Sequence, residues 1–200
     1  MCQLFETIKY CDGKFYDLSF HNERMNNARK ILFDRNDKIK LENILSMQII
    51  EGNKAVKVNV YYSKEIEEVK YSVYESKKIE RLKMIICDEI EYEFKYSDRR
   101  IFDELKEKAF CEENEEILII KNNFITDTSF TNVAFYDGKK WFTPSTPILK
   151  GTKRAQLLKD GIMTEFELKK EDLNKFISVK LFNAMLDFDN CPTLPTTSIY

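Results

Sequence analysis

The sequence predicts an α+β protein, with a small N-terminal α+β domain and a larger C-terminal domain that is rich in β-strands and carries helices. Three patterns support this fold class. Polar and apolar residues alternate over residues 54–62, as in a half-buried strand. Apolar residues recur at helical spacing over residues 25–32, and apolar runs alternate with turn residues over residues 117–144. We expect domains at residues 1–86 and 87–200, although no linker rich in Pro, Gly or Ser marks this boundary.

The N-terminal domain is expected to contain three strands and two helices. Its first strand ends at the turn residues Asp12-Gly13, and the following helix begins with Ser19 or Asn22 as its N-cap. The strands are expected at residues 6–10, 54–62 and 70–75, and a second, short helix at residues 41–50. In the third strand, the candidates for inward-facing side chains are Tyr71, Val73 and Tyr74. Residues 79–86 mix charged and apolar side chains and are expected to bridge to the next domain.

The C-terminal domain begins its strand pattern with the apolar run Ile117–Ile120, which suits a buried strand. Turns are expected at Asn122-Asn123 and at Asp137-Gly138, with antiparallel strands beside them. Gly151 then leads into a helix, and the free backbone N–H groups at a helix N-terminus favour an anion such as phosphate. The acidic residues 112–116 are expected to form a solvated turn.

Composition limits the classes of function. The 200 residues include 32 Lys and Arg against 34 Asp and Glu, so the net charge of -2 gives no basic field for nucleic acid. No apolar run approaches the ~20 residues of a membrane span, and the N-terminus lacks the pattern of a signal peptide. We therefore expect a cytoplasmic protein. Five cysteines without C-x-x-C spacing and a single histidine predict free thiols and no metal site.

An ordered set of motifs carries the strongest functional signal. Residues 127–132 read DTSFTN, a later hairpin ends in WFTP at residues 141–144, and residues 149–154 read LKGTKR before a helix. Near the N-terminus, residues 6–8 read ETI, and His21 and Arg24 follow in an H-x-x-R spacing. This order resembles the class IV aminotransferase family. Its members are pyridoxal-phosphate (PLP) enzymes of fold type IV and include branched-chain and D-amino-acid aminotransferases and 4-amino-4-deoxychorismate lyase.

The resemblance implies PLP as the cofactor and assigns three charged residues to it. Lys95 corresponds to the lysine that binds PLP covalently and transfers protons, so it is the expected catalytic residue. Arg24 corresponds to the arginine that binds the PLP phosphate, and a guanidinium suits this role because it grips phosphate oxygens in pairs. Asp127 stands where the family typically has a glutamate beside the pyridine nitrogen. The alternative for Arg24 is a solvated arginine on the helix surface, and the alternative for Asp127 is a turn carboxylate. His21 is expected to pack or to form a hydrogen bond.

Further cofactor contacts follow from the same resemblance. Beside Asp127, three polar residues are expected to orient the carboxylate or the ring, or else to satisfy the local turn: Thr128, Ser129 and Asn132. Around the helix start, the backbone N–H groups near Gly151 are expected to hold phosphate, and the residues there are Thr152 and Lys153, where the family more often has Ile-Thr. Asn183 is expected near the phosphate as well. Weaker candidates for substrate contacts are Thr7, Arg99 and Arg100.

The segment LFNAM at residues 181–185 resembles one found in aminodeoxychorismate lyases. The expected function is therefore a PLP-dependent lyase of folate biosynthesis that converts 4-amino-4-deoxychorismate to 4-aminobenzoate and pyruvate. An aminotransferase acting on branched-chain or D-amino acids is the first alternative, and a PLP-binding or interaction protein with reduced activity is the second. The resemblance also implies a homodimer. Because family members carry a hairpin and a glycine-rich loop before the ETI strand, the small domain is expected to be trimmed.

Overall fold

The computed structural model describes residues 2–46 and 54–200, and it divides the chain into two compact units. The first unit contains residues 1–75 together with the short segment 94–98, and the second contains residues 76–93 and 99–200. The boundary expected after residue 86 therefore falls inside the second unit. In the described part of the chain, no helix is both long and apolar enough to cross a membrane.

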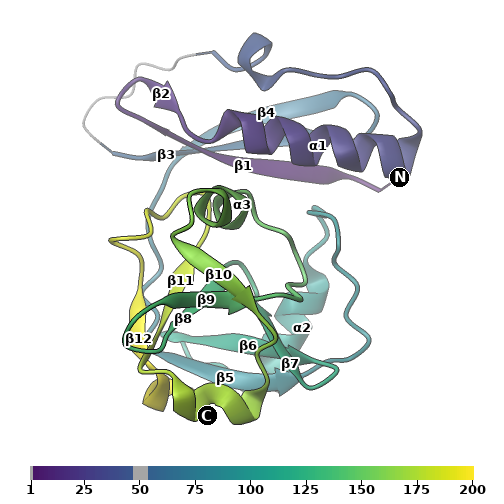
Figure 1. Cartoon of the computed structure of the whole chain (residues 1–200). Helices are drawn as coiled ribbons and strands as arrows, with labels where there is room; N and C mark the ends of the chain where they lie inside the picture. The colour runs from purple at the N-terminus through teal and green to yellow at the C-terminus, as the bar shows by residue number, and fades with distance from the viewer. Residues whose placement is uncertain (1, 47–53) are drawn as a thin grey trace. The chain divides into compact units, whose positions relative to one another are not determined.

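The first unit is a four-stranded antiparallel sheet with a helix on one face (Figure 1). The strand order is β2-β1-β3-β4. Alternation directs one side of β1 and β3 toward helix α1, where Leu4, Ile8 and Val58 pack with Met25. The elements are β1 (Leu4–Cys11), β2 (Lys14–Phe15), α1 (Leu18–Phe33), the 3₁₀ turn η1 (Leu41–Asn43), β3 (Val56–Tyr62) and β4 (Ile66–Val73).

Two expectations for the first unit need correction. The third strand begins earlier than expected and ends at Val73, which is 46% exposed. Tyr74 lies beyond the strand end, so only Tyr71 of the three inward candidates remains in β4 and packed against the core. The short helix expected at residues 41–50 is a single 3₁₀ turn where the structure describes it, and residues 47–50 lie outside the described part.

The second unit packs a five-stranded sheet against a three-stranded sheet. The sheet orders are β10-β9-β8-β11-β12 and β5-β6-β7. Their shared core includes Leu82, Leu118, Phe135 and Val179. The strands are β5 (Arg81–Ile86), β6 (Glu115–Lys121), β7 (Phe124–Thr128), β8 (Asn132–Tyr136), β9 (Trp141–Pro144), β10 (Met163–Phe166), β11 (Ser178–Phe182) and β12 (Thr193–Pro195). The helices are α2 (Arg100–Lys108), α3 (Thr152–Lys159) and the 3₁₀ helices η2 (Lys170–Lys175) and η3 (Thr196–Ser198).

Two expectations for the second unit are wrong for physical reasons. Residues 81–86 form β5, which pairs in parallel with β6, so this stretch belongs to a sheet and not to a bridge between domains. Glu115 and Glu116 are 2% and 0% exposed, although a solvated turn was expected. They are the first residues of β6, and cationic side chains neutralise them: Lys83 lies 2.8 Å from Glu115, and Lys106 lies 2.8 Å from Glu116. The expected turns at residues 122–123 and 137–138 are confirmed.

Candidate functional site

Asp127 is a buried carboxylate near the end of β7, in the second unit. Its Oδ1 accepts a hydrogen bond from Asn132 Nδ2 at 2.7 Å, and its Oδ2 accepts one from the backbone N–H of Leu149 at 3.0 Å. Burial raises the pKa of Asp127 to about 6, and the hydrogen bonds and the charge of Arg154 only partly offset this effect. A buried carboxyl with such a pKa is suited to pair with a cationic N–H group.

Asn132, the first residue of β8, links this carboxylate to the segment before α3. Its Nδ2 also donates to the carbonyl oxygen of Leu149 at 2.9 Å. Gly151 is required at this place, because a Cβ on residue 151 would lie 2.0 Å from Asn132 Oδ1. Asp127, Asn132 and Gly151 therefore form one packed group. The structure thus gives Asn132 the role of orienting the carboxylate.

The loop between β7 and β8 is closed by its own hydroxyl groups. Thr128 Oγ1 and Thr131 Oγ1 are 2.7 Å apart, and Thr128 Oγ1 also accepts a hydrogen bond from the backbone N–H of Thr131 at 2.9 Å. Both residues are buried. Thr128 therefore satisfies the local turn, which was one of the two roles expected for it.

Two further predicted residues bind backbone carbonyl groups of the same loop. Arg99 Nη2 donates to Ser129 O at 2.5 Å, and the Arg99 guanidinium lies 4.8 Å from the ring centre of Phe102. Asn183 Nδ2 donates to Phe130 O at 3.3 Å. These contacts give Arg99 and Asn183 structural roles in holding the loop that follows Asp127. Substrate binding by Arg99, and by Arg100, which is exposed, stays a prediction.

Helix α3 begins at Thr152, directly after Gly151. Lys153 Nζ donates to Gln156 Oε1 at 3.2 Å. Arg154, which the sequence reasoning did not single out, is 4% exposed, and its Nη2 donates to Glu165 Oε1 at 2.6 Å and to Pro144 O at 2.8 Å. The sequence feature that could have pointed to Arg154 was its position three residues after Gly151. Phosphate binding at this helix start stays a prediction.

Lys95 belongs to the first unit, where residues 94–98 run along β1. The carbonyl oxygen of Lys95 accepts a hydrogen bond from the backbone N–H of Phe5 at 3.0 Å, and Lys95 Nζ lies 4.6 Å from the ring centre of Phe5. The β1 strand therefore fixes the backbone of the predicted catalytic lysine. Thr7 lies two residues further along β1 and alternates to the same face as Phe5.

Arg24 also belongs to the first unit and is not a solvated surface residue. Its Nε donates to Glu6 Oε1 at 2.9 Å, and its Nη2 donates to Glu6 Oε2. His21 Nδ1 lies 2.6 Å from Glu6 Oε2, so His21 forms the kind of hydrogen bond that was expected. Sequence reasoning gave no role to Glu6. The signal was present, because Glu6 occupies an inward position between Leu4 and Ile8 and a buried carboxylate requires a partner.

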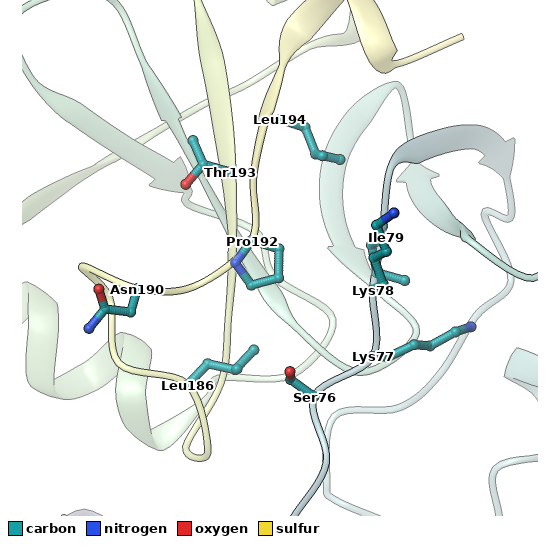
Figure 2. A pocket seen from close by; sticks show the side chains of 9 residues that line it. All are labelled: Ser76, Lys77, Lys78, Ile79, Leu186, Asn190, Pro192, Thr193 and Leu194. Carbon is teal, nitrogen blue, oxygen red and sulfur yellow. The ribbon is translucent and has the colours of Figure 1, made fainter.

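A pocket of about 350 Å³ on the second unit is a separate feature (Figure 2). It lies between the segment that begins at Ser76 and the segment before and within β12. Its apolar wall includes Leu186 and Pro192, and the side chain of Lys77 extends away from them in this view. None of the predicted site residues lines this pocket.

Comparison with known proteins identifies the family. The sequence pattern described as "Amino-transferase class IV" matches residues 94–188. An uncharacterized protein of Haemophilus influenzae is 34% identical over 189 residues, which is 92% of this chain and 98% of that protein. The crystal structure of a protein of Haemophilus somnus 129PT, provisionally named a 4-amino-4-deoxychorismate lyase, is 28% identical, has a TM-score of 0.81 and covers 92% of this chain and 97% of its own.

More distant structures share the fold alone. The PLP-bound form of a hypothetical aminotransferase from Mycobacterium tuberculosis is 15% identical, with a TM-score of 0.73, and the match covers 95% of this chain and 83% of that one. The fold is therefore that of the fold type IV enzymes, as predicted. The chain belongs to the class IV aminotransferase family.

Proposed function

We propose that this chain is a PLP-dependent enzyme that converts 4-amino-4-deoxychorismate to 4-aminobenzoate and pyruvate. The observation that carries the proposal is the buried Asp127 carboxylate, held by Asn132 and by the backbone of Leu149 and positioned in the family's motif order after Arg24 and Lys95. The lyase reaction is favoured over amino transfer by the similarity to the Haemophilus somnus protein and by the segment at residues 181–185.

The donor set fits the chemical groups of PLP. An amine, a guanidinium and a buried carboxylate match the aldehyde, the phosphate and the pyridine nitrogen of the cofactor. Lys95 would bind the cofactor covalently, Arg24 and the backbone at Gly151 would bind the phosphate, and Asp127 would hold the proton on the pyridine nitrogen. PLP supplies an electron-accepting ring that stabilises negative charge at the substrate carbon bearing nitrogen.

In the proposed reaction, the contribution of the protein is the transfer of protons to and from the substrate. The Lys95 amine takes the proton from the ring carbon that bears the substrate amine. The bond between the substrate ring and the enolpyruvyl oxygen would then break and the ring would become aromatic. The proton that Lys95 took would be delivered to the methylene carbon of the departing group to give pyruvate. The atoms of the substrate are thereby divided between 4-aminobenzoate and pyruvate. Asp127 would stay ionised and would keep a proton on the ring nitrogen of the cofactor.

The first test is an absorbance spectrum of the purified chain with PLP, followed by addition of 4-amino-4-deoxychorismate and assay of both products. We expect a bound-cofactor band and equal amounts of 4-aminobenzoate and pyruvate. A bound cofactor without these products would overturn the lyase assignment and favour the aminotransferase alternative, which an assay for keto acid release would then examine. Absence of a cofactor band would overturn the PLP proposal itself.

A second test addresses Lys95. After borohydride reduction, peptide mass spectrometry should find the pyridoxyl group on the peptide that contains Lys95. Lys108 lies on α2 and is exposed, so Lys108→Ala is a matched control for removal of a lysine charge. The Lys95→Ala variant should lose the modification and the activity, and Lys108→Ala should keep both. A modification that persists in Lys95→Ala would contradict the assignment.

A further inference from the structure

A buried carboxylate stands behind Arg24 in the first unit. The Glu6 side chain is 0% exposed, and both of its oxygens are occupied by cationic or N–H donors. Oε1 accepts from Arg24 Nε, and Oε2 accepts from Arg24 Nη2 and lies 2.6 Å from His21 Nδ1. Leaving a carboxylate unpaired in such a place would be strongly destabilising. The cluster is therefore a paired arrangement that the fold maintains.

The geometry of the cluster fixes the plane of the Arg24 guanidinium. Arg24 uses two of its nitrogens on the two oxygens of Glu6, which is the bidentate fork that orients a guanidinium. His21 lies three residues earlier on α1 and therefore on the same helix face as Arg24. Because His21 holds one carboxylate oxygen from a second direction, rotation of the Glu6 carboxylate is also restricted.

Each titratable group of this cluster has one dominant protonation state at neutral pH. Burial would raise the pKa of Glu6, but the Arg24 charge and the hydrogen bonds from His21 and Arg24 outweigh it and lower that pKa to about 2. Burial lowers the pKa of His21, against the opposing influence of Glu6. The histidine is thus neutral, and since an ionised carboxylate only accepts, Nδ1 carries the hydrogen. Tyr62 is neutral too, because burial raises its pKa.

Access to the cluster is one-sided. The Arg24 side chain is 18% exposed, whereas those of Glu6 and His21 are 0% exposed. An anion arriving from solvent can therefore reach Arg24 but neither of the two residues behind it. Any influence of Glu6 and His21 on such an anion has to act through Arg24.

We propose that Glu6 and His21 are positioning residues that hold the Arg24 guanidinium ready for the phosphate group of PLP. This inference rests on the proposed function, since it takes PLP as the ligand and Arg24 as its phosphate contact. An arginine side chain loses much of its rotamer freedom when it binds a ligand, and a side chain that is already held in place has lost that freedom beforehand. Glu6 and His21 thus increase the affinity of Arg24 for the phosphate group in particular.

Two effects of Glu6 oppose each other, and this makes the proposal testable. Its negative charge weakens the attraction between Arg24 and phosphate, while its two hydrogen bonds with Arg24 hold the guanidinium in place. If the charge effect dominated, Glu6→Gln would bind PLP more tightly. The proposal requires the opposite result, because it assigns the larger effect to orientation.

The test compares dissociation constants for PLP and for pyridoxal, which has the same ring and aldehyde but no phosphate. Both are titrated by absorbance into the full chain, as wild type, Glu6→Gln and Arg24→Gln. We expect Glu6→Gln to reduce the preference for PLP over pyridoxal by about tenfold, as befits hydrogen bonds between charged groups, with pyridoxal affinity unchanged. Glu6→Gln in the Arg24→Gln background should have no further effect. An unchanged or increased preference in Glu6→Gln would overturn the proposal.

His21 provides the second pair of variants. His21→Leu removes the N–H donor, whereas His21→Asn places an amide N–H close to the position of Nδ1. We expect His21→Leu to lower the preference for PLP and His21→Asn to restore most of it, with folding of each variant checked by circular dichroism. A purely structural role would weaken PLP and pyridoxal by the same factor, and that result would overturn the proposal even if Glu6→Gln did not fold.

The outcomes also separate this inference from the proposed function. If wild type binds PLP and the folded variants keep its preference for the phosphate, the positioning role alone is wrong. If wild type does not bind PLP at all, both the proposed function and the positioning role are wrong.

Discussion

The Asp127 carboxylate makes the stability of the protein depend on pH in a distinctive direction. Its pKa in the folded chain is about 6, against 3.8 for an unburied aspartate. The folded state therefore holds the proton more tightly than the unfolded state, so stability is lost as pH rises from about 4 through 6. A shift of this size corresponds to about 3 kcal/mol.

The prediction compares wild type with Asp127→Asn in urea unfolding at pH 4 and pH 7, without PLP. Other titrating groups, including Glu6 with its pKa of about 2, are present in both proteins and cancel in the difference. The unfolding free energy of wild type relative to Asp127→Asn should fall by about 2 kcal/mol between these pH values, because the unfolded aspartate is already largely ionised at pH 4. A difference that stays constant with pH would mean that Asp127 is not the titrating group.

Gly151 is expected to tolerate no side chain while Asn132 occupies its observed position. The Cβ of Gly151→Ala would lie 2.0 Å from Asn132 Oδ1, and a displaced Asn132 would lose its bonds to Asp127 and Leu149. Gly151→Ala should destabilise the protein by about 2 kcal/mol in urea unfolding. In an Asn132→Ala background the same substitution should cost much less. Additive costs in the double variant would rule out this steric explanation.

At the scale of elements, helix α2 is tied to strand β6 by a buried ion pair. The Glu116 side chain is 0% exposed, and its Oε2 lies 2.8 Å from Lys106 Nζ. Removing the lysine would leave a buried carboxylate unpaired, so Lys106→Met should destabilise the protein by about 3 kcal/mol in urea unfolding. Lys108→Ala, at an exposed position on the same helix, should change stability little. Lys106→Met combined with Glu116→Gln should recover most of the loss, and no recovery would contradict the pairing argument.

The sequence predicts strands correctly where the local pattern of residues determines which side chains are buried. It fails where burial or strand pairing depends on residues that lie far away in the sequence. The apolar run of β6 and the alternation of β3 were predicted because each strand buries the side chains that its pattern indicates. The burial of Glu115 and Glu116 was not, because it depends on Lys83 and Lys106, which lie on other elements. For the same reason β5 was missed: its mixed residues 81–86 form a strand through pairing with β6.

The candidate site follows the same rule. The motif order, through the family resemblance, assigned Asp127, Asn132 and Gly151 to one cofactor site, and the structure shows that these three residues lie together. It could not predict that the second partner of Asp127 is the backbone N–H of Leu149, since a backbone donor carries no sequence signal. The pairing of Arg24 with Glu6 joins residues 18 positions apart, so it also depends on how α1 packs on β1.

At the scale of the whole molecule, we propose that the chain forms a homodimer, as its family resemblance implies. Several large apolar side chains of the second unit are exposed in the single chain, including Ile86 at 60%, Phe110 at 84% and Ile177 at 62%. Exposed apolar surface of this kind is what an interface would cover. Light scattering should give about twice the chain mass of 23.8 kDa at micromolar concentration. A mass of one chain at every concentration would contradict the proposal.

Binding of PLP should stabilise the folded chain, because a ligand that binds only the folded state shifts the unfolding equilibrium. With free PLP at a hundredfold excess over its dissociation constant, the gain is about 2.7 kcal/mol. For a chain of this size we expect the melting temperature to rise by roughly 5–10 °C. Lys95→Ala should show a much smaller rise at the same PLP concentration, since it lacks the covalent bond, whereas Lys108→Ala should match wild type. An equal rise in Lys95→Ala would show that the stabilisation does not depend on Lys95.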